Sequence, residues 1–461
     1  MHLPDYLLRS LQHVNGFAEE TFKAVHASGV QLTSVRMNPG KIINDQSLQG
    51  PAGNTPLEQV PWCANGYYLN ERPSFTADPL FHAGAYYVQE ASSMFLEQAL
   101  QQTVDLTQPI RILDLCAAPG GKSTLIQSLL PAESLLVSNE VIKTRVNILS
   151  ENITKWGAAN VIVTNNDPKD FQRLQQYFDV IVVDAPCSGS GLFRKDAMAI
   201  EEWSLNNVQL CSQRQQRILA DIMPALKENG ILIYSTCSYS TEEDETICDW
   251  LMEEMQMESL QLKADKSWGI VETVSEIKKG YGYRFYPDKV KGEGFFIAAF
   301  KQQGDDNVIA TATKTKDKPA KPTTKEIDIV KPWIKDAPNF FFIKQNEELI
   351  AMPLHFENDL ALIQAALYIK KAGIRMGTVI REELIPHHEL ALSTIINTTT
   401  PACDASLETA LQYLRKQDIK IETTIKGWAL IQYRQLPLGW IKILPNRVNN
   451  YYPKEWRILN K

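Results

Sequence analysis

Two of the seven cysteines directly follow runs of β-branched residues and lie in small polar turns. Cys187 lies in DAPCSG after residues 179–184, and Cys237 lies in STCSY after residues 231–236. If these runs form neighbouring parallel strands, about 4.8 Å apart, both thiols reach the same edge of one sheet. A lone cysteine is most often a small buried hydrophobe, but a polar turn at a strand end favours a chemical role.

Paired thiols suit one kind of group transfer. A thiolate can add to C6 of a pyrimidine, and C5 then becomes nucleophilic enough to attack an electrophilic methyl group such as that of S-adenosylmethionine. Asp184 is the nearest acid that could protonate or hydrogen-bond N3 of the base. A second thiol is useful when the C5 proton leaves and the sulfur is expelled. Lys122 would favour the thiolate if its ammonium enters the pocket, although a structural lysine is an equal alternative.

A small-residue loop follows the run 110–115. The segment DLCAAPGGKST at 114–124 leads into the apolar stretch LIQSLL, and such a turn lets backbone approach a ligand at a helix N-terminus. The ending GKS matches a phosphate loop, but Cys116 stands where that motif needs its first glycine. An adenosyl site is favoured because Glu140 lies 20 residues after Gly120, where a ribose-binding acid is expected. Asp167 could accept from the adenine amino group.

The elements that must position these residues alternate between strand-like and helix-like stretches. This alternation predicts βαβ units in a parallel, Rossmann-like α/β sheet with helices on both faces. The stretch 200–226 predicts one long helix closed by Asn229-Gly230, and residues 283–286 and 294–300 predict a final hairpin. The strand-like runs are 110–115, 135–139, 160–164, 179–184 and 231–236.

The chain of 461 residues is too long for one core, so several domains are expected. Residues 302–327 lack apolar periodicity and predict a linker between a domain at 101–301 and a C-terminal region at 328–461. Residues 1–100 form an N-terminal domain or a cap on the sheet, with helices at 4–14 and 17–28 and another at 89–101. After the linker we expect strands at 332–356, a helix at 357–371 and a hairpin at 427–444.

Charge and composition limit the classes of partner. Net charge is −7, but residues 401–461 carry ten Lys and Arg against five Asp and Glu, so a basic tail follows an acidic body. No apolar run is long enough to span a bilayer, and Asp5 and Arg9 interrupt any secretory signal, so a cytoplasmic protein without a membrane partner is expected. The absence of a CxxC pair argues against zinc, and His387-His388 predicts a helix start, so no metal is expected.

The basic tail interleaves aromatic residues with cations, as an RNA-stacking and phosphate-binding surface would, although the aromatics could equally form a small core. The residues are Trp428, Tyr433, Trp440, Tyr451, Tyr452 and Trp456 with Lys426, Arg434, Lys442, Arg447, Lys454 and Arg457.

The three motifs DLCAAPGGK, DAPCSGSG and YSTCSYSTEEDE together resemble the Nop2/Sun-type RNA cytosine-C5 methyltransferases. The resemblance covers residues 81–301, and PLGWIK with the NNYYPKEWR ending resembles the PUA-like tails of the bacterial small-subunit (16S) rRNA branch. It implies that Cys237 is the nucleophile and that Cys187 assists product release. The basic segment 36–41, RMNPGK, matches the family's N-terminal RNA-binding segment. The implied contacts to S-adenosylmethionine are Cys116, Ala117, Ala118, Pro119, Gly120, Gly121, Lys122, Glu140, Asp167 and Asp184.

The sequence therefore predicts an S-adenosylmethionine-dependent RNA (cytosine-C5)-methyltransferase with an α/β methyltransferase sheet, a small N-terminal α/β domain and a C-terminal α+β PUA-like region. Its expected partner is rRNA or the small ribosomal subunit, with tRNA as the alternative substrate. Two other classes stay open, a phosphate-loop ATP-binding protein associated with RNA and a noncatalytic RNA-binding protein.

Overall fold

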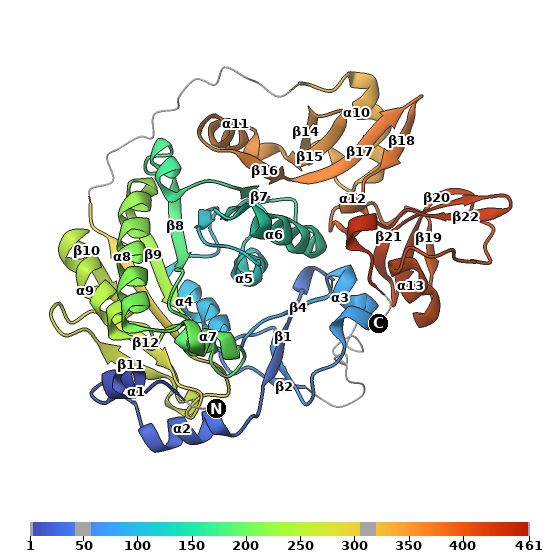
Figure 1. Cartoon of the computed structure of the whole chain (residues 1–461). Coiled ribbons are helices and arrows are strands. Elements are labelled where there is room, and N and C mark those ends of the chain that lie inside the picture. Colours follow the sequence, from blue (N-terminus) through green and yellow to red (C-terminus); the bar gives the residue numbers. More distant parts are fainter. Residues whose placement is uncertain (1–2, 42–56, 305–319, 460–461) are drawn as a thin grey trace.

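A ten-stranded mixed sheet lies at the centre of the protein (Figure 1). The computed structural model describes residues 3–41, 57–304 and 320–459. The strand order is β11-β12-β13-β9-β8-β5-β6-β7-β16, and β10 pairs with β13. The strands are β5 (Arg111–Asp114), β6 (Leu135–Asn139), β7 (Val161–Thr164), β8 (Phe178–Asp184), β9 (Leu226–Thr236), β10 (Met257–Leu260), β11 (Val271–Val274), β12 (Tyr281–Phe285), β13 (Phe295–Gln302) and β16 (Ile369–Ala372).

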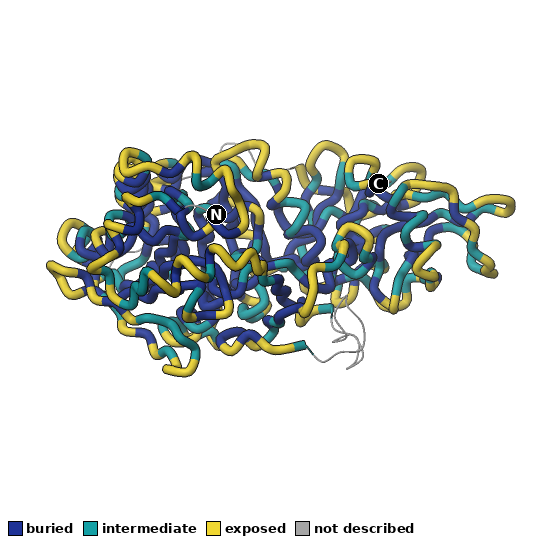
Figure 2. The backbone as a smooth tube through the Cα atoms, turned by 60° about the horizontal axis from the view of Figure 1, so that its bottom comes forward, coloured by how far each residue is buried: buried dark blue, intermediate teal, exposed yellow. Residues whose placement is uncertain are grey.

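The five expected strands β5 to β9 all form and pair in parallel, which confirms the Rossmann-like sheet. Their β-branched residues point alternately to two faces, and each face carries its own buried core. Apolar residues of α4 (Leu96–Thr103), α5 (Gly121–Leu129) and α6 (Lys143–Trp156) pack in one core. Those of α8 (Leu205–Ile222), α9 (Glu245–Glu254) and α11 (Glu357–Ala366) pack in the other. Strands β5 to β8 are mostly buried. Figure 2 shows that buried residues concentrate inside the molecule and exposed ones on its outer loops.

Two expectations about the sheet region are wrong in detail. The expected single helix is divided into α7 (Ala197–Glu202) and α8, because the Ser204 side chain accepts a hydrogen bond from Asn207 N at 3.1 Å and starts a new helix. Asn229-Gly230 does not stop a helix but lies within β9. Asn229 adopts a left-handed φ of 60° where the pairing of β8 and β9 shifts register, so the turn-like pair forms an irregularity in a strand.

The N-terminal region adds a second, four-stranded sheet with the order β2-β3-β1-β4. The expected helices appear as α1 (Asp5–Leu11) and α2 (Glu19–Ala27), while the one expected at 89–101 starts only at Leu96, as α4. The sequence predicted a small α/β domain here but gave no positions for its strands, which are short. They are β1 (Thr33–Met37), β2 (Glu58–Gln59), β3 (Gly66–Leu69) and β4 (Tyr86–Val88). The short helix α3 (Pro79–Ala83) lies between β3 and β4.

After residue 320 the chain returns to the central sheet. Strand β16 pairs antiparallel with β7 and lies beside it in Figure 1. Helix α11 carries Asp359, which is bonded by Arg111 of β5 at 2.5 Å and 3.1 Å and by the Tyr177 hydroxyl. The helix expected at 357–371 therefore ends at Ala366, because its last residues form β16 instead. Most of the expected linker, residues 305–319, lies outside the described residues, but its last residues begin the capped helix α10 (Thr324–Val330).

Two further four-stranded sheets complete the C-terminal region. The first contains β14 (Phe340–Gln345), β15 (Glu348–Pro353), β17 (Ile374–Ile380) and β18 (Glu383–Pro386), with α12 (His388–Leu392) following. The second contains β19 (Ala402–Asp404), β20 (Gly427–Tyr433), β21 (Leu436–Leu444) and β22 (Arg447–Asn450), with α13 (Leu407–Leu414). The expected hairpin at 427–444 is the β20–β21 pair. Across the described segments, no helix is both long and apolar enough to cross a membrane.

Candidate active site

The strand order reverses between β5 and β8, and the carboxyl ends of parallel strands form a ligand crevice at such a switch point. The loop after β5 turns through Gly120, whose φ of 116° favours glycine, and enters α5. One buried amide connects the neighbouring loops. Asn139 donates to the carbonyls of Leu115 at 3.2 Å and Asn166 at 3.0 Å, and its backbone carbonyl accepts from Ala117 N at 2.8 Å.

Three carboxylates gather in this crevice. The pKa of Asp114 is raised to about 7, mainly by burial, with a smaller contribution from the charges of Asp184 and Glu140 and with Ser123 and Lys122 acting in the opposite direction. Ser123 Oγ donates to one Asp114 oxygen at 2.6 Å, while the other oxygen is buried without a hydrogen-bond partner in the structure. Asp114 was not among the expected site residues, although its place as the last residue of a strand before a glycine loop was a usable signal.

Glu140 and Asp167 lie where the sequence placed them, after β6 and β7. Glu140 is buried, accepts from Ile142 N at 2.9 Å and lies 3.5 Å from Arg145. Asp167 is half-buried and accepts from Lys169 N at 3.3 Å, so it caps the following turn. Both carboxylates keep unused acceptor positions, because an ionised carboxylate has about four.

Lys122 connects the glycine loop to the end of β8. Its ammonium lies 2.8 Å from Asp184 Oδ2 and 5.1 Å from the centre of the Phe295 ring. Ser235 Oγ donates to the other Asp184 oxygen at 2.8 Å. Asp184 is about one-third exposed, so this ion pair lies at the open side of the crevice.

The two cysteines of the strand-end turns meet at the same edge. Strands β8 and β9 place Asp184 opposite Ser235, and Cys187 Sγ lies 2.9 Å from Cys237 Sγ as a free thiol pair. The hydrogen bond with Cys237, together with burial, raises the pKa of Cys187 well above its usual range. Cys187 therefore holds its proton and can donate it toward the sulfur of Cys237. Gly191 N donates to the Cys237 carbonyl at 2.8 Å and fixes the backbone of that turn.

A buried carboxylate, Glu243, holds the two cysteine turns together. It accepts from Ser188 N at 2.8 Å, from the hydroxyls of Ser188 and Ser238, and from Gln215 Nε2 at 3.1 Å. Ser188 follows Cys187 and Ser238 follows Cys237, so one side chain sets the position of both thiols. Burial raises the pKa of Glu243. The sequence showed Glu243 only as part of an acidic run and gave no reason to place it inside the protein.

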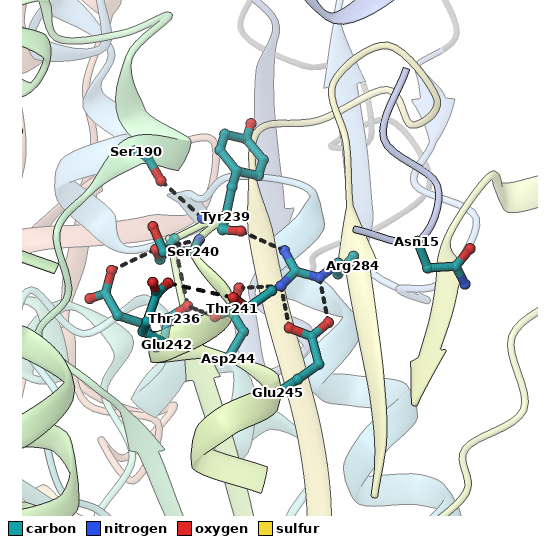
Figure 3. Close-up of polar contacts among 12 residues, drawn as sticks. Asn15, Ser190, Thr236, Tyr239, Ser240, Thr241, Glu242, Asp244, Glu245 and Arg284 are labelled. Carbon is teal, nitrogen blue, oxygen red and sulfur yellow. Dashed lines mark hydrogen bonds and ion pairs between the residues drawn. The ribbon is translucent and has the colours of Figure 1, made fainter. Parts of the chain in front are cut away.

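A second buried ion cluster supports the turn after Cys237. Arg284 of β12 pairs with Glu245, lies 3.1 Å from Asp244 Oδ2 and donates to the Tyr239 carbonyl at 2.9 Å. Figure 3 shows its guanidinium between Glu245 and the Tyr239 backbone. Thr236 Oγ1 donates to Asp244 at 2.7 Å, next to Cys237 in the chain. Removing one member would leave an uncompensated buried charge and would destabilise this support.

The basic segment 36–41 does not present its cations to a partner, contrary to expectation. Arg36 is 1% exposed, and its guanidinium donates to Gln89 at 2.9 Å and to Thr124 of α5 at 2.6 Å. Lys41 donates to the carbonyls of Ala83 and Lys155. These two side chains therefore fix the N-terminal region against α5 and α6, the helices beside the glycine loop.

The aromatic residues of the basic tail are largely core residues, so the expected stacking surface is wrong for three of them. Trp428, Trp440 and Tyr452 are 9%, 1% and 1% exposed. Trp440 Nε1 donates to the His387 carbonyl at 2.9 Å, which joins the last sheet to α12. Tyr451 is the aromatic that stays clearly exposed, at 39%.

Comparison with known proteins connects this geometry to a family. The family model described as 16S rRNA methyltransferase RsmB/F matches residues 101–301. The N-terminal domain of 16S rRNA methyltransferase RsmF matches residues 3–91, and the methyltransferase RsmF PUA domain matches residues 400–458. Among solved structures, a methyltransferase homolog protein from Pyrococcus horikoshii is 27% identical with a TM-score of 0.52, covering 65% of this chain and all of that one.

Whole-chain relatives agree with the domain models. Ribosomal RNA small subunit methyltransferase F from Shewanella sp. (strain W3-18-1) is 30% identical over 447 residues, covering 92% of this chain and 90% of that protein. The protein of the same name from Vibrio atlanticus is 30% identical over 451 residues, with the same coverage. Since the match extends over all three regions of the fold, the chain belongs to the ribosomal RNA small subunit methyltransferase F family.

Proposed function

We propose that this chain transfers a methyl group from S-adenosylmethionine to C5 of a cytosine in 16S rRNA through a covalent bond between Cys237 and C6. The observation that carries the proposal is the 2.9 Å pair of thiols at the ends of β8 and β9, beside the crevice of the parallel sheet. The family relationship supports ribosomal RNA as the substrate.

The crevice fits the proposed cofactor. Asp114 supplies a buried oxygen without a hydrogen-bond partner, and Glu140 and Asp184 add carboxylates beside it. Carboxylates suit a ligand with a sulfonium and an ammonium, and the ribose hydroxyls can donate to Glu140. When bound, S-adenosylmethionine supplies an electrophilic methyl group. The expected contacts Cys116–Lys122 lie in the loop and helix start that border this crevice.

The two thiols then have separate roles. The Cys237 thiolate forms a bond to C6, and the electron pair released at C5 takes up the methyl group, so that S-adenosylhomocysteine is left as the neutral product. The Cys187 proton, held by its raised pKa, stabilises the neighbouring sulfur before attack. The C5 proton then passes to solvent water, and the electron pair of the C5–H bond forms the C5–C6 double bond as the bond between C6 and sulfur breaks and Cys237 leaves as a thiolate. We assign to Cys187 assistance in this release.

We assign to Asp184 a contact with the target cytosine ring. Its carboxyl lies at the open side of the crevice, held by Lys122 at 2.8 Å and Ser235 at 2.8 Å. This carboxylate can accept a hydrogen bond from N3 of a protonated cytosine, which makes C6 more electrophilic. Because C5 and C6 are hidden inside a helix, the target cytosine must be single-stranded or flipped out of the stack.

Equilibrium dialysis and methyl transfer test this proposal together. We expect the full chain to retain S-adenosylmethionine but not ATP, and to form 5-methylcytosine in 16S rRNA or assembled small subunits lacking the modification. Retention of ATP without S-adenosylmethionine would overturn it in favour of a phosphate-loop protein. Methylation of tRNA without rRNA would overturn the substrate assignment, and RNA binding without any transfer would make the chain a noncatalytic RNA-binding protein.

A further inference from the structure

Three large apolar side chains are exposed around the carboxyl ends of β6 and β7. Val141 and Ile142, which follow Glu140, are 54% and 47% exposed, and Tyr368 is 65% exposed. Tyr368 comes from the other side of the linker, between α11 and β16. Exposed apolar residues that gather beside a polar crevice often mark a ligand surface, whereas isolated ones need no explanation.

The backbone of Tyr368 is held firmly against the loop after β7. Its amide donates to Asn166 Oδ1 at 2.9 Å, and its carbonyl accepts from Asn165 N at 3.2 Å and from Asn166 Nδ2 at 3.0 Å. The next residue, Ile369, pairs with Thr164 in the sheet. All these bonds use the Tyr368 backbone, so they fix its position while leaving its ring free.

Asn165 also connects Tyr368 to the other two apolar residues. Its side-chain amide donates to the carbonyls of Glu140 at 2.6 Å and Val141 at 3.0 Å, while its backbone amide bonds Tyr368. A single asparagine therefore holds Val141 and Tyr368 on either side of itself. Asp167 follows two residues later and Glu140 precedes Val141, so carboxylates flank the apolar group.

These residues offer an aromatic ring and apolar side chains for the faces of an adenine, and a carboxylate for its amino group. A purine has two apolar faces and an edge with an amino donor, and base stacking on an aromatic ring is sequence-tolerant and strong. We propose that the Tyr368 ring packs on the adenine of S-adenosylmethionine, at the end of the crevice bordered by Val141, Ile142 and Asp167. This inference rests on the proposed function, because it assumes that the cofactor occupies the crevice. It makes the C-terminal region part of the cofactor site through β16.

The test is cofactor binding by the full-length Tyr368→Ala variant, measured by isothermal titration with S-adenosylmethionine and S-adenosylhomocysteine. The substitution keeps every backbone hydrogen bond, so the variant should melt at the wild-type temperature. Loss of one stacked ring should weaken both ligands about 5-fold or more. Tyr368→Phe should restore affinity, because the ring and not the hydroxyl makes the contact. Tyr6→Ala, which removes another exposed tyrosine, is the matched control.

Steady-state kinetics separate this role from an RNA contact. We expect Tyr368→Ala to raise KM for S-adenosylmethionine and to leave KM for RNA and kcat near the wild-type values. A wild-type affinity for the cofactor in Tyr368→Ala would overturn the inference, and so would a raised KM for RNA alone. If the wild-type chain itself binds no S-adenosylmethionine, the proposed function fails first, which distinguishes the two failures.

Discussion

Replacing Glu243 with alanine should loosen both cysteine turns at once. Glu243 is fully buried and is the shared acceptor for Ser188, Ser238 and Gln215. In Glu243→Ala the Ser188 amide and the Gln215 side chain each lose an acceptor, and an unsatisfied buried donor costs about 1–3 kcal/mol. The serine hydroxyls can rotate toward other acceptors and add little.

Part of this loss is offset, because burial makes the Glu243 charge unfavourable and raises its pKa. Two donors that each lose an acceptor would together cost about 2–6 kcal/mol. Because of the offset, we expect Glu243→Ala to lower the free energy of unfolding by about 2–4 kcal/mol. Methyl transfer should fall at least about 10-fold, because small displacements of reacting groups are costly. Urea unfolding and the rate of methyl transfer to rRNA measure the two effects.

Glu242→Ala is the matched control for this experiment. It removes the same charge from the neighbouring residue, which is half-buried and lies 3.5 Å from the Thr241 hydroxyl. Its unfolding free energy should stay within about 0.5 kcal/mol of the wild type. Equal stability and equal activity of the two variants would refute the role assigned to Glu243.

Three other perturbations address the crevice and its supports. Cofactor affinity should rise as pH increases through about 7, because a cationic ligand binds the ionised form of Asp114, and titration of Asp114→Asn should show no such rise. Arg36→Ala should weaken cofactor binding, because Arg36 holds α5, and should leave the affinity for RNA in filter binding unchanged. Weaker RNA binding with unchanged cofactor binding would show that Arg36 contacts RNA. A chain ending at Gly304 should melt lower and bind less cofactor, since it lacks α11 and β16, and an unchanged melting temperature would contradict their place in the core.

The sequence predicted the parallel strands and the position of both thiols. The runs that became β5 to β9 are β-branched and bounded by turns, so local preference and tertiary burial agree. Cys187 and Cys237 each follow such a run, and adjacency of β8 with β9 brings them together. The roles of the two thiols came from family resemblance, because chemistry alone does not order them.

Other features depend on contacts between distant segments, which local patterns do not reveal. The sequence IKKA of β16 is short and half charged, and it becomes a strand only because β7 offers a free edge. Arg36 reads as an exposed cation, yet Gln89 and Thr124 satisfy it in the interior. Glu243 stands in an acidic run that resembles a solvated turn, and its burial follows from donors on two other segments.

Covalent trapping distinguishes the nucleophilic cysteine from the cysteine that assists release. Full-length Cys187→Ala and Cys237→Ala proteins would be incubated with S-adenosylmethionine and unmethylated 16S rRNA, and denaturing gels would then reveal any protein bonded to RNA. We expect a stable adduct with Cys187→Ala and none with Cys237→Ala. An adduct with Cys237→Ala and none with Cys187→Ala would contradict the assignment of the nucleophile.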